Sequence, residues 1–154
     1  VFVPRDSHAQ NLIWLPDRNG TARVGLLDHQ DALAGHPGYD LASLLEDARR
    51  DVPPEIQQQM IELYCRERQA LDVHFNADAW RTGYDLLAAQ RNTKIIGIFA
   101  RLAVRDGKPA YLPLIGRVWR LLSDDLTRAG LEDVRDWFDR HWPPETRVAP
   151  KGQS

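Results

Sequence analysis

From residue 38 to residue 142, apolar side chains recur at intervals of three and four, the spacing that gathers them on one face of an α-helix. Pro53-Pro54 opens one such segment, and Asn76 is a candidate N-cap for the next. Asp106-Gly107 and Gly130 stand where the pattern stops. We therefore expect five or six helices after residue 38. The apolar positions that carry the pattern are Leu41, Leu44, Leu45, Ala48, Ile56, Met60, Leu63, Tyr64, Trp80, Tyr84, Leu87, Ala88, Ile95, Ile96, Phe99, Leu102, Ala103, Val118, Leu121, Leu122, Leu126, Val134, Trp137, Phe138 and Trp142.

The first 31 residues have a different pattern. Leu12–Leu15 and Val24–Leu27 are short apolar runs, and the segment between them begins Pro-Asp-Arg-Asn-Gly, a sequence typical of turns. The two runs are predicted to form a β-hairpin, so the fold class is α+β and mainly α. A hairpin brings its open ends together. The polar residues expected to be neighbours there are Asp6, His8 and Asn11 on one side and Asp28 and Asp31 on the other.

Composition excludes several classes of protein. The 154 residues include 20 Lys and Arg against 22 Asp and Glu, so the net charge of −2 argues against a nucleic-acid binder that works by bulk charge. No apolar run approaches the roughly 18 residues of a membrane-spanning helix. A single cysteine, Cys65, excludes an internal disulfide framework and suits a reducing compartment, so we expect a cytoplasmic location with no membrane partner.

Three side chains of the predicted hairpin ends suit phosphoryl transfer. That chemistry needs a carboxylate to orient the attacking hydroxyl and oxygen ligands for Mg²⁺. Asp6 can serve as the first, and Asn11 with Asp28 as the second, because amide and carboxylate oxygens suit a hard cation. Asp6 and Asn11 lie five residues apart on one loop, and Asp28 would reach them across the hairpin.

Three motifs stand out by their order and spacing: Arg5-Asp6-Ser7-His8-Ala9-Gln10-Asn11, Leu27-Asp28, and Gly35-His36-Pro37-Gly38-Tyr39-Asp40-Leu41-Ala42. Together they resemble the motifs of the kinase-like phosphotransferases of the aminoglycoside phosphotransferase and choline kinase group. Two departures from the usual pattern are Pro4, where the group commonly has His, and Ser7, where an aromatic residue is common.

Three longer segments, 26–32, 39–52 and 89–99, narrow the resemblance. They resemble bacterial anomeric sugar kinases, which phosphorylate N-acetylmuramate and N-acetylglucosamine. The resemblance implies a protein-kinase-like C-terminal lobe over residues 1–142, followed by a flexible tail over 143–154. It implies ATP and Mg²⁺, with Asp6 as catalytic base, Asn11 and Asp28 as metal ligands, and Arg5 and Asp40 supporting the catalytic loop.

The resemblance also implies an N-terminal lobe that binds ATP, with a glycine-rich loop and a strand lysine. Neither motif occurs in these 154 residues, so we expect the chain alone to bind ATP poorly and to be inactive. Its activity would belong to a longer protein.

Other polar residues have both a structural and a functional interpretation. His8 is expected to be a hydrogen-bonding residue of the loop rather than a proton shuttle, and Asp31 could contact substrate or remain solvated. Asp40 precedes an apolar helical run and is therefore also a candidate N-cap. Arg91 and Asn92 could contact a carboxylate or phosphate of the sugar, or form a solvated helix face.

Two other functions stay open. An aminoglycoside or another small molecule could replace the amino sugar as acceptor, although the acids are well mixed with arginines, which favours a neutral or anionic sugar. Alternatively, the chain could be a non-catalytic helical interaction module or a kinase relic, which Pro4 and the lack of an N-terminal lobe would suit.

Overall fold

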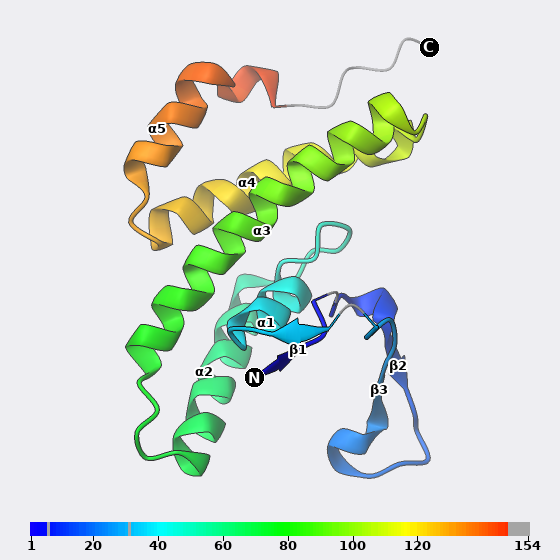
Figure 1. Ribbon diagram of the computed structural model, residues 1–154, viewed down its shortest axis with the longest axis vertical. Coiled ribbons are helices and arrows are strands. Elements are labelled where there is room, and N and C mark those ends of the chain that lie inside the picture. Colours follow the sequence, from blue (N-terminus) through cyan, green and yellow to red (C-terminus); the bar gives the residue numbers. More distant parts are fainter. Residues whose placement is uncertain (6, 31, 148–154) are drawn as a thin grey trace. The chain divides into compact units, whose positions relative to one another are not determined.

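The computed structural model describes residues 1–5, 7–30 and 32–147, and it divides the chain into two compact units, Val1–Tyr84 and Asp85–Ser154. Its helices confirm a mainly helical fold with a small hairpin (Figure 1). None of the described helices has both the length and the apolar character needed to cross a membrane. The α-helices are α1 (Gly38–Leu45), α2 (Pro54–Leu71), α3 (Ala77–Arg105), α4 (Leu112–Arg128) and α5 (Glu132–His141).

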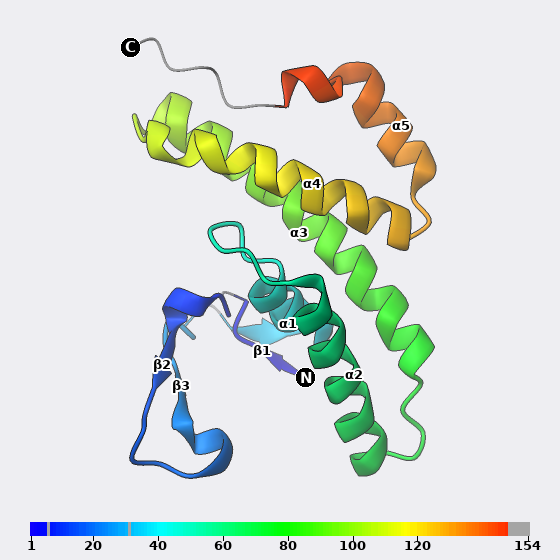
Figure 2. The same cartoon turned by 180° about the vertical axis from the view of Figure 1, so that it is seen from behind.

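The predicted hairpin is confirmed in the first unit. Strand β2 (Leu12–Trp14) pairs antiparallel with β3 (Val24–Leu26), in a register that places Leu12 opposite Leu26. A second antiparallel pair, between β1 (Phe2–Val3) and β4 (Leu33–Ala34), was not predicted. Val3 is 2% exposed and supplies its buried side chain. In both views β1 lies beside α1, and the hairpin projects on the side away from α2 (Figures 1 and 2).

Trp80, near the start of α3, organises the helical part of the first unit. Its ring stacks on Tyr64 of α2 at 4.6 Å and lies 5.6 Å from the ring of Tyr84. The predicted N-cap is confirmed, because the Asn76 carboxamide accepts a 2.9 Å hydrogen bond from the Ala79 backbone N–H. Pro54 is the first residue of α2, where its missing N–H costs nothing.

The second unit has its own apolar core between α3 and α4. The buried residues Ala89, Trp119, Leu122 and Leu126 form this core. Phe138 of α5 meets the Trp119 ring edge to face at 5.2 Å. Large aromatic side chains bury much of the apolar surface that stabilises so small a unit.

A polar network also joins α3 to α4 within this unit. Asn92 and Asp125 are fully buried, and the Asn92 amide donates a 2.7 Å hydrogen bond to the Asp125 carboxylate. Arg128 donates to Asp125 and, at 3.1 Å, to the 5%-exposed Asp85. Buried polar groups need such partners, so the network fixes which residues of α3 face α4.

The chain continues past α5 into a hydrogen-bonded turn. Residues Pro144–Thr146 form a single 3₁₀ turn. Arg147 donates to the Trp142 carbonyl at 2.7 Å and to Asp139 at 2.5 Å, and its guanidinium lies 4.4 Å from the Trp119 ring centroid. The segment predicted as a flexible tail therefore begins with a packed turn, and its remaining residues, 148–154, lie outside the described residues.

Candidate active site

The open end of the hairpin brings two predicted site residues together. The Leu27 backbone N–H donates a 2.9 Å hydrogen bond to the Asn11 carbonyl, which extends the β2–β3 ladder by one pair. Asp28 follows directly, so Asn11 and Asp28 leave the same end of the hairpin. The predicted partners Asp6 and Asp31 lie outside the described residues.

His8 shapes the loop that leads to Asn11. Its side chain is 8% exposed, and its Nδ1 accepts a 3.2 Å hydrogen bond from the Gln10 backbone N–H. Its carbonyl accepts from the Asn11 N–H at 2.9 Å, which closes the 3₁₀ turn Ala9–Asn11. Both contacts are those of a loop-forming residue and set the position of Asn11.

Asp40 ties the predicted catalytic loop to helix α1. Its Oδ1 accepts hydrogen bonds from the Arg5 backbone N–H at 3.0 Å and from the Ser7 hydroxyl at 2.9 Å. The carboxylate therefore holds the chain on both sides of position 6.

The expectation that Asp40 is an N-cap is wrong. Helix α1 begins earlier, at Gly38, with Pro37 in the capping position, and Asp40 lies in the first turn. Pro37 has the φ of −66° that its ring imposes, which suits a helix start. The earlier start frees the Asp40 carboxylate for the loop.

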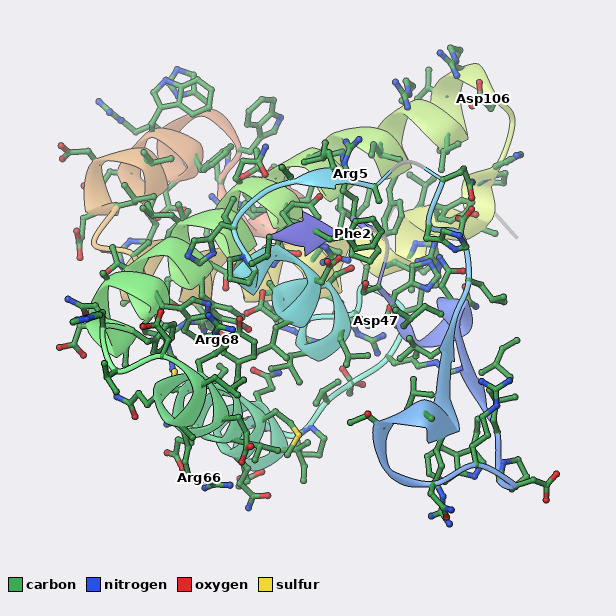
Figure 3. The ribbon with its side chains drawn as sticks, turned by 60° about the horizontal axis from the view of Figure 1, so that its bottom comes forward. Phe2, Arg5, Asp47, Arg66, Arg68 and Asp106 are labelled. Carbon is green, nitrogen blue, oxygen red and sulfur yellow. The ribbon has the colours of Figure 1, made fainter. Side chains whose placement is uncertain are left out.

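Two strained backbone positions fall at this site. Arg5 (φ 76°) and Asp28 (φ 57°) are the only non-glycine residues with positive φ in the described part of the chain. A side chain in this region costs about 1 kcal/mol or more, although Asp tolerates it better than most residues. Arg5 is labelled in Figure 3, just after β1. Such strain is commonly retained where backbone direction matters for function.

The donor set at the hairpin end fits Mg²⁺ rather than a softer metal. Asn11 and Asp28 offer one amide and one carboxylate oxygen, and Mg²⁺ typically takes few protein ligands because phosphates and water supply the others. Asp28 Oδ1 accepts a 2.5 Å hydrogen bond from the Gln30 side chain, which orients the carboxylate. The described residues contain no group of three His, Cys, Asp or Glu side chains that could hold a metal.

Arg91 and Asn92 lie in the second unit and are not on a solvated helix face. Arg91 is 7% exposed and Asn92 is fully buried, whereas Lys94 is exposed. Since Asn92 is engaged with Asp125, the described arrangement gives it a packing role. Contact of either residue with substrate stays a prediction.

Sequence reasoning missed a contact made by His36. Its Nδ1 accepts the Gly38 N–H at 3.1 Å, and its ring lies directly against Gly83 of α3. The available signal was an isolated glycine inside a helical apolar pattern, which commonly marks a close approach. The sequence alone did not identify what approaches it.

Comparison with known proteins assigns a class to this arrangement. Residues 1–74, which contain the hairpin, Asp40 and α2, match the phosphotransferase enzyme family. This matched segment, just under half of the chain, is similar to that family.

Particular relatives extend the similarity over nearly the whole chain. It is 48% identical over 147 residues to the N-acetylmuramate/N-acetylglucosamine kinase of Caulobacter vibrioides, covering 96% of this chain and 39% of that protein. Proteins of the same name from Pseudomonas putida and Neisseria meningitidis serogroup B are 35% and 39% identical, over 83% and 76% of this chain and 37% and 34% of theirs. The chain thus spans less than two fifths of the length of these relatives.

Proposed function

We propose that this chain is the C-terminal lobe of an ATP-dependent sugar kinase. The names of the relatives suggest N-acetylmuramate or N-acetylglucosamine as the acceptor. The hydroxyl that we propose is the anomeric C1 hydroxyl, which the resemblance to anomeric sugar kinases implies. The single observation that carries the proposal is that Asn11 and Asp28 lie at the same end of the hairpin. The hydrogen bond between Leu27 and Asn11 closes this end. An amide and a carboxylate placed there match the ligand pair that kinase-like folds use for Mg²⁺.

Each side chain has a distinct part in the reaction. Asp6 orients the sugar hydroxyl and accepts its proton as the oxygen attacks the γ-phosphorus and ADP departs. Asn11 and Asp28 are the residues that would hold Mg²⁺, and the ion would supply positive charge against the phosphate oxygens. Asp40, through Arg5 and Ser7, keeps the backbone around position 6 in place, so that the hydroxyl is presented in line.

The remaining parts of the proposal concern the whole protein. A separate N-terminal lobe binds the adenine and the α- and β-phosphates, so residues 1–154 alone turn over little or nothing. Residues 1–142 form the acceptor lobe. The enzyme works in the cytoplasm on a small sugar, without a nucleic-acid or membrane partner.

The test is substitution at the predicted base and at one metal ligand in the full-length protein. Asp6→Ala and Asp28→Asn should each lower kcat at least about a hundredfold while leaving the unfolding midpoint nearly unchanged. Asp17→Ala is the matched control, because Asp17 is an exposed acid in the connection of the same hairpin. Formation of ADP is followed with N-acetylmuramate, N-acetylglucosamine and an aminoglycoside as separate acceptors.

Two results would contradict the proposal. An unchanged kcat in Asp6→Ala would show that Asp6 is not the catalytic base. A full-length protein that binds no nucleotide in the presence of Mg²⁺ would be the relic rather than the enzyme. Turnover with the aminoglycoside alone would keep the reaction and replace the sugar.

A further inference from the structure

The imidazole of His36 is held within the first unit by a hydrogen bond and by ring stacking. Nδ1 accepts the 3.1 Å hydrogen bond from the Gly38 backbone N–H, at the first residue of α1. One ring face is stacked on Trp80 of α3, with the ring centroids 6.2 Å apart and an interplanar angle of 25°. Because Nδ1 acts as an acceptor, it carries no proton and the ring is neutral.

Two glycines make room for this ring. A Cβ built on Gly83 would lie 2.6 Å from His36 Nε2 and 2.9 Å from Cε1, closer than nonbonded atoms approach. A Cβ on Gly38 would lie 3.0 Å from Nδ1. Glycine inside a helix costs about 0.5–1 kcal/mol relative to alanine. The contact with His36 supplies the physical reason for retaining glycine at position 83 of α3.

The hydrogen bond to Gly38 has a consequence two residues further on. It fixes the first turn of α1, the turn that contains Asp40. Asp40 in turn accepts from the Arg5 N–H and the Ser7 hydroxyl, on either side of position 6. A continuous series of contacts, made by residues adjacent in sequence and by hydrogen bonds, therefore leads from Gly83 on α3 to the predicted catalytic loop.

We propose that His36 is a positioning residue of the catalytic loop, and that its neutral ring, seated on Gly83, fixes α1 so that Asp40 holds the backbone around position 6. The role in turnover rests on the kinase function proposed above. The positioning itself is a property of the folded chain and can be measured without turnover.

The kinetic test first introduces a steric clash with the His36 ring and then removes the clash. In the full-length protein Gly83→Ala should lower kcat about ten- to a hundredfold, the loss expected when catalytic groups move by up to about 1 Å, with the KM for ATP nearly unchanged. His36→Asn should restore kcat in the Gly83→Ala background. The asparagine side chain can still accept the Gly38 N–H but has no ring to meet the new methyl group.

Two further variants complete the kinetic comparison. His36→Leu keeps the bulk of the side chain but has no acceptor, so it should behave like Gly83→Ala. Gly97→Ala is the matched control on the same helix, because a Cβ there meets nothing within 4 Å. It should leave kcat unchanged and slightly raise the unfolding midpoint, through helix propensity alone.

The second readout is amide hydrogen exchange of the peptide that contains Arg5 and Ser7. Gly83→Ala and His36→Leu should speed exchange at the Arg5 amide at least about tenfold, since that amide is bonded to Asp40. The double variant Gly83→Ala/His36→Asn should return it to the wild-type rate. Unchanged exchange in Gly83→Ala, or a loss that His36→Asn fails to rescue, would overturn the positioning role. Absence of turnover in the wild type would instead overturn the kinase function and leave the exchange result decisive for His36.

Discussion

Replacement of Asn92 by alanine tests whether this residue packs the second unit or binds the sugar. Its side chain is fully buried and donates a 2.7 Å hydrogen bond to the equally buried Asp125. A hydrogen bond to a charged group contributes about 1.5–3 kcal/mol, and truncation leaves a small cavity in addition. Asn92→Ala should therefore lower the free energy of unfolding by about 2–4 kcal/mol.

The assay is urea unfolding followed by tryptophan fluorescence, which reports the core that contains Trp119. The slope with denaturant should stay unchanged while the midpoint falls. Lys94→Ala, at an exposed site two residues away, is the control and should change stability by less than about 0.5 kcal/mol. In an Asp125→Ala background Asn92→Ala should cost clearly less, because the partner has already been removed.

A specific outcome would refute this reasoning. If Asn92→Ala unfolds at the wild-type urea concentration but raises the KM for the sugar severalfold, the buried hydrogen bond from Asn92 does not stabilise the functional protein. Asn92 would then be a substrate residue, as the family resemblance suggested.

Three further changes have defined outcomes. Asp40→Ala should lower kcat more than tenfold, while Asp40→Asn, which keeps an acceptor oxygen for Arg5 and Ser7, should retain most activity; equal losses in steady-state kinetics would contradict the positional role. Burial, and secondarily the α-amino group of Val1, lowers the pKa of His36 from 6.5, so the unfolded chain binds that proton first. Stability should fall as pH drops below about 6.5, and this component should vanish in His36→Asn when unfolding is measured across pH. Arg147→Ala should lower stability by about 1–2 kcal/mol in thermal unfolding, since it removes the contact with the Trp119 ring; an unchanged midpoint would show that this turn does not support the second unit.

The parts of the fold that local sequence specifies were predictable. The Pro16–Gly20 turn sequence indicated the hairpin, and Asn76 indicated the start of α3. The β1–β4 pair was not predictable, because strands of two residues carry no periodicity and their pairing joins residues thirty or more positions apart.

Helix α3 shows how a buried polar group obscures a pattern. Its apolar periodicity stops after Ala88 and resumes at Ile95, yet the helix is continuous from Ala77 to Arg105. The interruption contains Arg91 and Asn92, polar residues that are nevertheless buried. Only their partners, far along the chain, explain why they face inward, and a periodicity rule does not consider partners.

The candidate site divides in the same way. The hairpin predicted the proximity of Asn11 and Asp28 from topology alone, and the hydrogen bond from Leu27 to Asn11 agrees with it. The roles of Asp6 and Asp31, which lie outside the described residues, stay predictions. His36 escaped notice because its significance depends on Gly83, forty-seven positions later.

The left-handed backbone at Arg5 and Asp28 lowers stability, so the residue that folds best at these positions differs from the residue that the proposed chemistry needs. Glycine would adopt either conformation without steric cost. A mutant library sorted only for well-folded molecules should therefore enrich glycine at both positions. The same library sorted for sugar phosphate production should retain aspartate at position 28. The difference between the two sorted pools would measure how much stability is lost by having a carboxylate at that position.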